Sequence, residues 1–337
     1  MAGAVHLVEP PFARGRVAEL RVIAPVPGPA FCLAESPLLA PGRATGGTYD
    51  RTVLMAPRLE LDTLTLSASR GGLPLEILSG VSLQVAPEES VGLVGESGSG
   101  KTMSMRAVMR LLPAGMRCTG EIRFEGRPVT TLSGRALGEF RRRDVGMVFQ
   151  DPHAAINPVR RIGDFLTEVH RHQPRAARRA ASTQAEDVLD RCGIHDPARV
   201  LELHPHQLSG GMLQRVMIAS VLTQRPKLIL ADEPTTALDV TTQSAVVALL
   251  DGVRRETGAS MVFVSHDIEL VAAICDRIVV MRAGRLIESL TPAQLYRGEI
   301  ADPYTAALLA CRPSVTTRHP RLPTMVQARG EDAGVPA

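Results

Sequence analysis

A short glycine-rich segment has the residue types and the spacing needed to bind a chain of phosphates. Its residues, in order, are Gly95, Glu96, Ser97, Gly98, Ser99, Gly100, Lys101 and Thr102. The glycines let backbone N–H groups surround phosphate oxygens, and a following helix adds the positive end of its dipole. In this pattern Lys101 reaches the β- and γ-phosphates and the Thr102 hydroxyl holds Mg²⁺. A glycine- and serine-rich turn without a ligand is the alternative, and the strand and helix expected on either side favour the phosphate site.

Two adjacent acids supply what such a site still needs, a group for the metal and a group for water. Asp232 and Glu233 follow the wholly apolar stretch 228–231. Placed beside the strand that precedes the phosphate loop, Asp232 would meet Mg²⁺ through its water shell, and Glu233 would polarise the attacking water. The alternative is that the two acids merely cap a strand, and the phosphate loop makes this the weaker interpretation.

A second candidate anion site lies at residues 208–215, which read LSGGMLQR. Ser209, Gly210 and Gly211 precede a helix expected from Met212 to about Gln224, and exposed N–H groups at its start would attract an anion. One nucleotide does not require two such sites in one chain. Two chains facing each other head to tail do, each using this segment on the other's nucleotide. The alternative is an ordinary helix N-cap by Ser209.

Strands that alternate with helices must position these residues. Strand-like stretches occur at 59–66, 81–85, 91–94, 121–125, 145–149, 228–231, 261–264, 277–281 and 285–288. Apolar residues recur with helical spacing from the phosphate loop to Pro113, through 160–225, and again around 246–253. The wholly apolar strands are typical of a parallel sheet that is buried on both faces. The pattern therefore predicts an α/β fold.

Composition narrows the classes of function. The chain has 337 residues, 45% of them apolar, and a net charge of +3. These values fit neither a disordered chain nor a strongly basic nucleic-acid binder. The sequence contains no run of 18 apolar residues that could span a membrane. Its five cysteines form no CxxC pair, which predicts reduced thiols rather than a disulfide framework or a zinc site.

The two ends of the chain lack the pattern of the middle. Residues 1–54 are rich in proline and glycine and show no sustained period. We interpret them as a disordered extension or as sequence upstream of the true start, and we favour Met55 as an alternative initiator. From about residue 312 the pattern is lost again, and we expect a frayed tail.

Six motifs occur in a fixed order along the chain. They are GESGSGKT at 95–102, VFQDP containing Gln150, LSGGMLQR, LILADEP, TALD ending at Asp239, and VFVSHD containing His266. Over about residues 57–312 the chain resembles the ATP-binding subunit of ABC transporters. The resemblance implies a phosphate-loop NTPase core of the ABC ATPase type, with an antiparallel β subdomain and an α-helical signature subdomain at about 151–225. Residues 1–56 and 313–337 lie outside it.

The resemblance also implies roles for individual residues in hydrolysis of ATP to ADP and phosphate. Gln150 is implied to touch Mg²⁺ and to report the nucleotide state to membrane subunits. Asp239 is implied to lie at a dimer interface, and His266 to contact the γ-phosphate. A lone glutamine or histidine would more often be a satisfied surface or core residue, so these roles depend on the shared order of motifs.

Further segments resemble the peptide and nickel importer branch of the family. They are GESG at 95–98, QDP at 150–152 with NP at 157–158, DEPTTALDV at 232–240 and DPYT at 302–305. LPAG at 112–115 and the Met212-Leu213 variant of the signature lean towards nickel or metallophore members. The implied partners are a second, non-identical ATPase subunit, two transmembrane permease subunits and, indirectly, an extracytoplasmic solute-binding protein, with no nucleic acid. The implied location is peripheral, on the cytoplasmic face of the plasma (inner) membrane.

Some positions depart from that family pattern. The family usually places an aromatic residue on the first strand to stack on adenine, and residues 65–70 contain none. Glu88 occupies a position where glycine is usual. The cysteine cluster that some peptide-importer subunits carry near the C-terminus is missing, so we expect no iron–sulfur cluster.

Two other classes of protein share part of this set of motifs with an importer subunit. A non-transport ABC ATPase acting on the ribosome or DNA usually has two cassettes in one chain or long coiled-coil insertions, and this sequence has one cassette and no sustained heptads. A phosphate-loop kinase or GTPase would leave residues 209–215 without a role. The leading hypothesis is therefore an ATPase that drives import of peptides, nickel or a metal chelate.

Overall fold

The computed structural model describes residues 56–70, 73–170, 174–235 and 240–310, and two β-sheets organise this part of the chain. The smaller sheet is antiparallel and has the strand order β2-β1-β4-β5. Its strands are β1 (Leu59–Arg70), β2 (Leu73–Val85), β4 (Arg117–Phe124) and β5 (Arg127–Pro128). Leu59, Leu61, Leu64 and Leu66 of β1 are all buried, and a register shift after Leu61 keeps them on one face.

The larger sheet has six strands in the order β10-β9-β3-β8-β7-β6. They are β3 (Ser90–Val94), β6 (Val145–Val148), β7 (Leu228–Asp232), β8 (Ser260–Val264), β9 (Arg277–Arg282) and β10 (Arg285–Leu290). Neighbouring strands run parallel except for the β9–β10 hairpin. Every residue of β3, β6, β7 and β8 is buried, as expected for strands covered on both faces. The predicted α/β fold is thereby confirmed.

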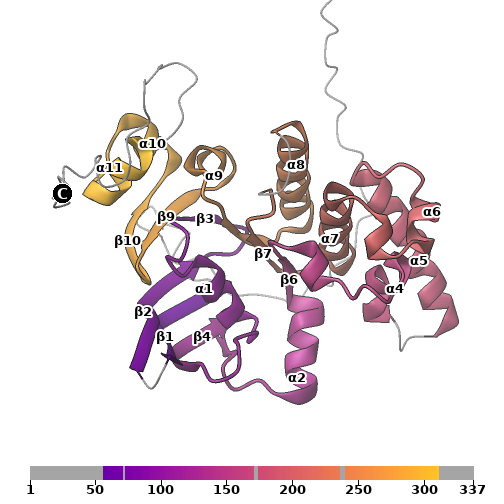
Figure 1. Cartoon of the computed structure of the whole chain (residues 1–337), viewed down its shortest axis with the longest axis horizontal. Helices are drawn as coiled ribbons and strands as arrows, with labels where there is room; N and C mark the ends of the chain where they lie inside the picture. Colours follow the sequence, from indigo (N-terminus) through magenta and orange to yellow (C-terminus); the bar gives the residue numbers. More distant parts are fainter. Residues whose placement is uncertain (1–55, 71–72, 171–173, 236–239, 311–337) are drawn as a thin grey trace, which may run out of the picture. The chain divides into compact units, whose positions relative to one another are not determined.

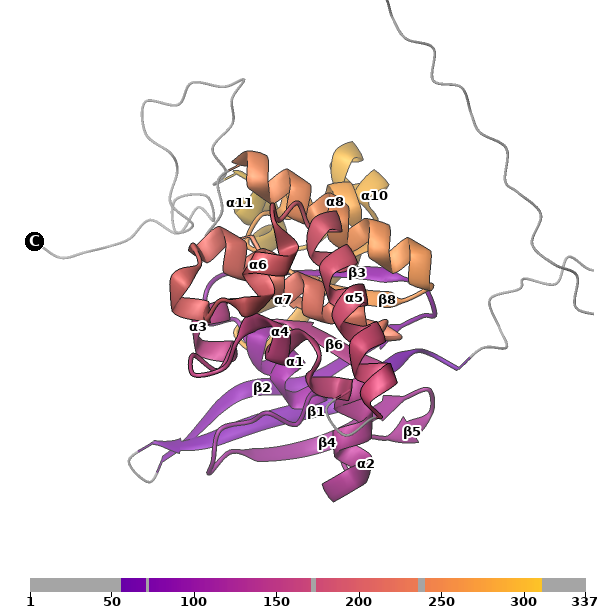
Figure 2. The same ribbon diagram turned by 90° about the vertical axis from the view of Figure 1, so that its right-hand side faces the viewer.

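Different elements cover the two faces of the larger sheet (Figures 1 and 2). On one side, α1 (Lys101–Val108) shares a hydrophobic core with the smaller sheet. On the other side, α7 (Gly210–Gln224), α8 (Val240–Thr257) and α9 (Ile268–Ile274) contribute to a second core. The phosphate loop lies at the start of α1, so its backbone joins β3 to the core between the two sheets.

The chain between β6 and β7 is helical, as the pattern predicts for residues 160–225. It contains α3 (Pro152–Ala155), α4 (Ile162–Leu166), α5 (Arg175–Arg191), α6 (Pro197–Glu202) and α7. The remaining helices are α2 (Gly134–Glu139), which continues into a π-helical turn at Phe140–Asp144, α10 (Pro292–Arg297) and α11 (Pro303–Ala310).

The predicted end of the helix that follows the phosphate loop is wrong. The apolar stripe predicts that the helix after the phosphate loop continues to Pro113, but α1 ends at Val108. Met109 forms its C-cap, and Arg110 then adopts a left-handed conformation with φ of 52°. This change of backbone hand ends the helix before the proline is reached.

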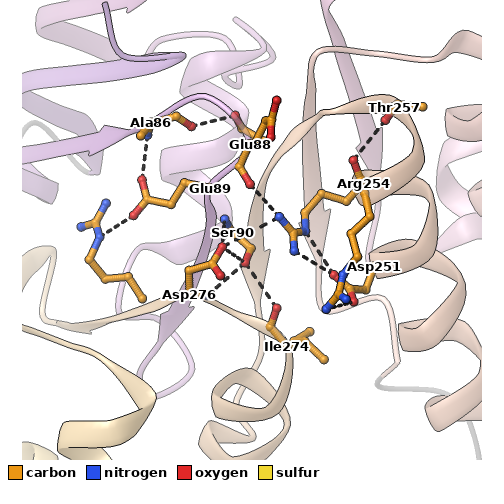
Figure 3. A network of polar contacts seen from close by, with 12 residues as sticks. Ala86, Glu88, Glu89, Ser90, Asp251, Arg254, Thr257, Ile274 and Asp276 are labelled. Atoms are coloured by element: carbon orange, nitrogen blue, oxygen red, sulfur yellow. Dashed lines mark hydrogen bonds and ion pairs between the residues drawn. The ribbon is translucent and has the colours of Figure 1, made fainter. Parts of the chain in front are cut away.

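A polar network anchors β3 at the end opposite the phosphate loop (Figure 3). The guanidinium of Arg254, on α8, donates to the carbonyl of Glu88 at 2.6 Å and pairs with Asp251 at 3.0 Å. The backbone N–H and the hydroxyl of Ser90 both donate to the carboxylate of Asp276, at 2.8 and 2.6 Å. Glu88 has φ of 64°, a conformation that glycine adopts without cost, which explains why this turn favours glycine. The network fixes the start of β3 between α8 and β9.

Candidate active site at the edge of the parallel sheet

The phosphate loop connects β3 to α1 and is pressed against the β9–β10 hairpin. Gly95, Gly98 and Gly100 have φ of 153°, 80° and 106°, a range that glycine adopts most readily. A Cβ atom at Gly95 would lie 2.1 Å from the carbonyl oxygen of Met281. The backbone N–H of Gly284 donates to the carbonyl of Ser99 at 3.0 Å. The hairpin therefore holds the loop at a distance that only glycine permits at Gly95.

Lys101 is the first residue of α1, and its side chain folds back over the loop. Its Nζ donates to the carbonyl oxygens of Gly95 and Glu96, both at 2.8 Å. The residue is 5% exposed. Burial lowers the pKa of this ammonium, and the carboxylates of Glu233 and Asp232 oppose that shift. The structure thus places a buried cation over the loop that the sequence predicts to bind phosphates.

Thr102, on α1, and Asp232, at the end of β7, meet although β7 does not neighbour β3, the strand before the phosphate loop. The Thr102 hydroxyl donates to Oδ1 of Asp232 at 2.9 Å. The expectation that the strand ending at Asp232 lies beside the strand before the phosphate loop is wrong, because β8 lies between β3 and β7. The contact forms because β3 and β7 both pair in parallel with β8, so their carboxyl ends reach the same edge of the sheet.

Asp232 is a buried acid, 1% exposed. Desolvation raises the pKa of its carboxyl group, and the hydrogen bond from Thr102 partly opposes the shift. The negative charge of Glu233 raises the pKa of Asp232 further. An ionised Asp232 is therefore costly in the protein by itself and would be favoured by a cation at this position.

Glu233, Gln150 and His266 converge from three strand ends. Gln150 lies after β6, and its Nε2 donates to Oε2 of Glu233 at 2.9 Å. Nδ1 of His266, which follows β8, lies 3.9 Å from the same oxygen. Glu233 itself has φ of 44°, a left-handed conformation that costs free energy in a residue with a side chain, and its N–H donates to the carbonyl of Val264. The structure thus brings together Glu233, assigned to catalysis from the acid pair, and Gln150 and His266, assigned by resemblance.

The segment LSGGMLQR at residues 208–215, the signature segment, contains the start of α7, which lies two residues earlier than expected. The helix starts at Gly210 rather than Met212, and it ends at Gln224 as predicted. The Ser209 hydroxyl accepts a hydrogen bond from the N–H of Met212 at 3.3 Å, so Ser209 is an N-cap. A Cβ atom at Gly210 would meet nothing within 4 Å, so this glycine faces open space. Asp239, assigned to a dimer interface by resemblance, lies outside the described residues.

One contact between the signature helix and the acids was not predicted from the sequence. Gln214, on α7, is 5% exposed, and its Nε2 donates to the carbonyl of Pro234 at 2.9 Å. Pro234 directly follows Glu233, so the bond ties α7 to the segment that carries the acid pair. A glutamine in the middle of a helix carries no local signal of such a partner, which is why the pattern did not reveal it.

The atoms at this edge that could bind a metal ion are oxygens, the ligand type that Mg²⁺ prefers. They belong to Thr102, Asp232 and Gln150, the residues that the sequence predicts to serve the metal. Among the described residues, no group of three or more histidine, cysteine, aspartate or glutamate side chains could hold a metal ion. A site for Mg²⁺ with few protein ligands fits these donors, because this ion usually keeps several waters and takes the rest of its ligands from substrate phosphates.

Comparisons of the chain with a family model, with curated relatives and with solved structures indicate which family it belongs to. The family model described as "ABC transporter" matches residues 78–236. The chain is 44% identical over 259 residues to the probable D,D-dipeptide transport ATP-binding protein of Escherichia coli, covering 76% of this chain and 79% of the relative. It is 38% identical to the oligopeptide transport ATP-binding protein of Bacillus subtilis, covering 76% and 72%. The chain belongs to the ATP-binding proteins of the ABC transporter family.

Other relatives are longer than this chain. The oligopeptide transport ATP-binding protein of Mycobacterium tuberculosis is 42% identical over 260 residues, which cover 77% of this chain and 42% of that protein. The chain thus spans about two fifths of the length of this curated relative. Among solved structures, a dimeric ATP-binding cassette in a post-hydrolysis state bound to ADP and Pi superimposes with a TM-score of 0.62 at 27% identity. That match covers 69% of this chain and 98% of the cassette.

We expect the substitution Asp232→Asn to stabilise the protein in the absence of nucleotide and metal. Because the pKa of Asp232 is higher in the folded protein than in the unfolded chain, the folded state holds the proton more tightly. This carboxyl group therefore favours folding at low pH, and the benefit is lost as pH rises through the folded-state pKa. The neutral amide can still accept the hydrogen bond from Thr102.

Thermal unfolding of the wild type and Asp232→Asn, from below pH 3.8, the ordinary pKa of an aspartate carboxyl group, up to pH 8, measures this difference. The gap between the two midpoints should widen as pH rises, in favour of the variant. A variant that is less stable than the wild type at pH 8 would contradict the assignment of a desolvated carboxylate.

Proposed function

We propose that this chain is the ATP-binding and ATP-hydrolysing subunit of an ABC importer that takes up peptides. The observation that carries the proposal is the hydrogen-bonded set at one edge of the parallel sheet, in which Thr102 contacts Asp232 and Gln150 contacts Glu233, beside the buried ammonium of Lys101. The relatives named for dipeptide and oligopeptide transport favour a peptide cargo over nickel or a metal chelate. The same names give no support to a ribosome- or DNA-directed ATPase.

In the proposed reaction, water attacks the γ-phosphate of ATP and yields ADP and phosphate. The carboxylate of Glu233 polarises this water and accepts its proton, and His266 donates to the γ-phosphate from the adjacent strand end. The ammonium of Lys101 has three N–H donors, so it donates to phosphate oxygens while the carbonyl of Gly95 keeps it over the loop. Mg²⁺, held by Thr102, Gln150 and Asp232, would supply Lewis-acid stabilisation of the charge on the phosphates.

The proposed active unit is a dimer with a second ATPase subunit, which we expect to be non-identical. Ser209, Gly210 and Gly211 present the start of α7, and they would contact the nucleotide held by the partner. Asp239 is assigned to the same interface by resemblance. The solved cassette that this chain resembles is dimeric, which supports this arrangement.

We expect Lys101→Ala to weaken ATP binding by about 100-fold or more, because the variant removes the buried cation that faces the phosphates. Lys227 provides a matched control. It is the second lysine of the chain, and it pairs with Glu125 at 2.7 Å outside the site. Equilibrium titration with ATP should show wild-type affinity for Lys227→Ala. Unchanged affinity in Lys101→Ala would remove the phosphate-loop assignment.

We expect Glu233→Gln to bind ATP with near-normal affinity and to lose turnover by about 100-fold to 10,000-fold, the range typical for a general base. The amide cannot accept the proton of water, so ATP should stay intact and the dimer should stay closed. Phosphate release and size-exclusion chromatography with ATP measure the two effects. Near-normal turnover would mean that another residue orients the water.

The other proposed partners of the dimer are two membrane-spanning permease subunits. Among the described residues, no helix combines the length and apolar character needed to cross a bilayer.

A cavity of about 820 Å³ opens between α2, α4 and the end of α7. Its apolar lining is Phe165, Leu166 and Val169. The two acids of the lining, Glu139 and Glu168, each pair with an arginine, Arg135 and Arg160. The exposed Arg142 and Arg143 add positive charge, so the cavity suits an amphipathic cytoplasmic segment with acidic side chains. We propose that a permease loop occupies it, which would place the chain peripherally at the inner face of the membrane.

Charge reversal of this cavity tests the docking proposal. We expect Arg142→Glu with Arg143→Glu to lower co-purification with the permease subunits by about tenfold or more, while ATP affinity stays normal. The matched control is Arg117→Glu with Arg127→Glu, two exposed positions on the smaller sheet. Equal loss in both double variants would mean that overall charge, and not the cavity, governs the association.

A further inference from the structure

The DPYT segment at residues 302–305 has no role in the proposed hydrolysis, yet the structure places it against the phosphate loop. Tyr304 is the second residue of α11 and is 1% exposed. Its Oη accepts a hydrogen bond at 3.1 Å from the backbone N–H of Glu96, the second residue of the loop. The two residues are 208 positions apart in the sequence. In Figure 1, α11 lies next to the β9–β10 hairpin, at the end of the larger sheet away from α7, and Tyr304 belongs to the same hydrophobic core as residues of α7.

The peptide group that Tyr304 contacts also serves Lys101. The N–H of Glu96 and the carbonyl of Gly95 belong to one peptide unit. The N–H donates to Tyr304, and the carbonyl accepts from Nζ of Lys101 at 2.8 Å. Because a peptide unit is planar, its N–H and C=O directions cannot change independently. Fixing the N–H on one side therefore fixes the acceptor for the ammonium on the other.

Tyr304 is itself held firmly by neighbouring elements. Oδ1 of Asp302 accepts from the N–H of Tyr304 at 2.7 Å, and the carboxylate of Glu288, on β10, accepts from the N–H groups of Ala301 and Asp302. The guanidinium of Arg282 lies 5.0 Å from the centre of the Tyr304 ring, within the range of a cation–π interaction. Arg282 ends β9, next to the turn that presses on the phosphate loop. The hydroxyl is thus presented to the loop by a rigid support.

We propose that Tyr304 is a positioning residue for nucleotide binding, which orients the Gly95–Glu96 peptide and, through it, the ammonium of Lys101. The inference rests on the proposed role of this loop in ATP binding. Without the hydroxyl, the peptide unit can rotate and the acceptor for Lys101 is no longer fixed. Nucleotide affinity then falls, whereas the groups that act on water, Glu233 and His266, keep their places.

Tyr304→Phe tests this role, because it removes only the hydroxyl and keeps the buried ring. We expect the KM and the Kd for ATP to rise about threefold to tenfold, as for the loss of one hydrogen bond, with kcat within about twofold of the wild type. Tyr296→Phe is the matched control. Tyr296 lies on α10 and is 68% exposed, so its loss of a hydroxyl should change neither constant.

A second measurement separates positioning from a general loss of structure. If Tyr304 acts through Lys101, adding Tyr304→Phe to Lys101→Ala should change the residual affinity for ATP by less than about twofold. The inference is overturned if Tyr304→Phe binds ATP as the wild type does, if kcat falls as much as KM rises, or if the effect persists undiminished in the Lys101→Ala background. A full-length wild-type chain that binds no ATP would overturn the proposed function and this inference with it. A wild-type chain that binds ATP leaves the proposed function standing whatever Tyr304→Phe shows.

Discussion

The hydrogen bond between Thr102 and Asp232 is the contact on which the candidate site depends. It joins the first turn of α1 to the end of β7, across the end of β8, and so defines where the phosphate loop and the acid pair meet. Parallel pairing makes this possible, since the carboxyl ends of β3, β7 and β8 all reach one edge. Glu233 and His266 follow β7 and β8 directly, so the register that sets the first contact also sets their separation.

Two kinds of restraint then hold the phosphate loop in the conformation that its glycines permit. On one side the β9–β10 hairpin approaches so closely that Gly95 has no room for a side chain. At the far end of β3, Arg254 and Asp276 bind the backbone and hydroxyl groups around Ser90. Glu88, in the turn before β3, has a positive φ, and backbone strain in a residue with a side chain persists only where the surroundings determine the conformation fully. Glu233, with its positive φ, is held in the same way by the carbonyl of Val264.

Local signals predicted most of what lies on a single element. The apolar runs 228–231 and 261–264 reported buried strands, and the glycines of 95–102 reported the phosphate loop, because burial and backbone freedom act residue by residue. The order of the strands in the larger sheet could not be predicted from such local signals. Nothing within residues 228–233 indicates that β8 separates β7 from β3, since the order depends on crossovers through distant helices. The end of α1 was misplaced because the left-handed turn at Arg110 overrides the apolar period.

Hydrogen bonds between elements far apart in the sequence could not be predicted from sequence patterns either. Gln214 and Tyr304 sit in helices whose periodicity says nothing of a partner on another element. The catalytic assignments for Gln150 and His266 needed the order of motifs, and their geometry became visible only when three strand ends were brought together.

The buried ammonium of Lys101 has an energetic consequence. Desolvation of this cation, together with its two bonds to loop carbonyls, is accomplished when the chain folds and not when a ligand arrives. A polyanion entering the loop meets a charge that is already stripped of most water and restricted in rotation, so little reorganisation remains to oppose association. The desolvation of Lys101 therefore lowers the stability of the unliganded protein and raises its affinity for phosphate. A change that increases one of these two quantities is expected to decrease the other.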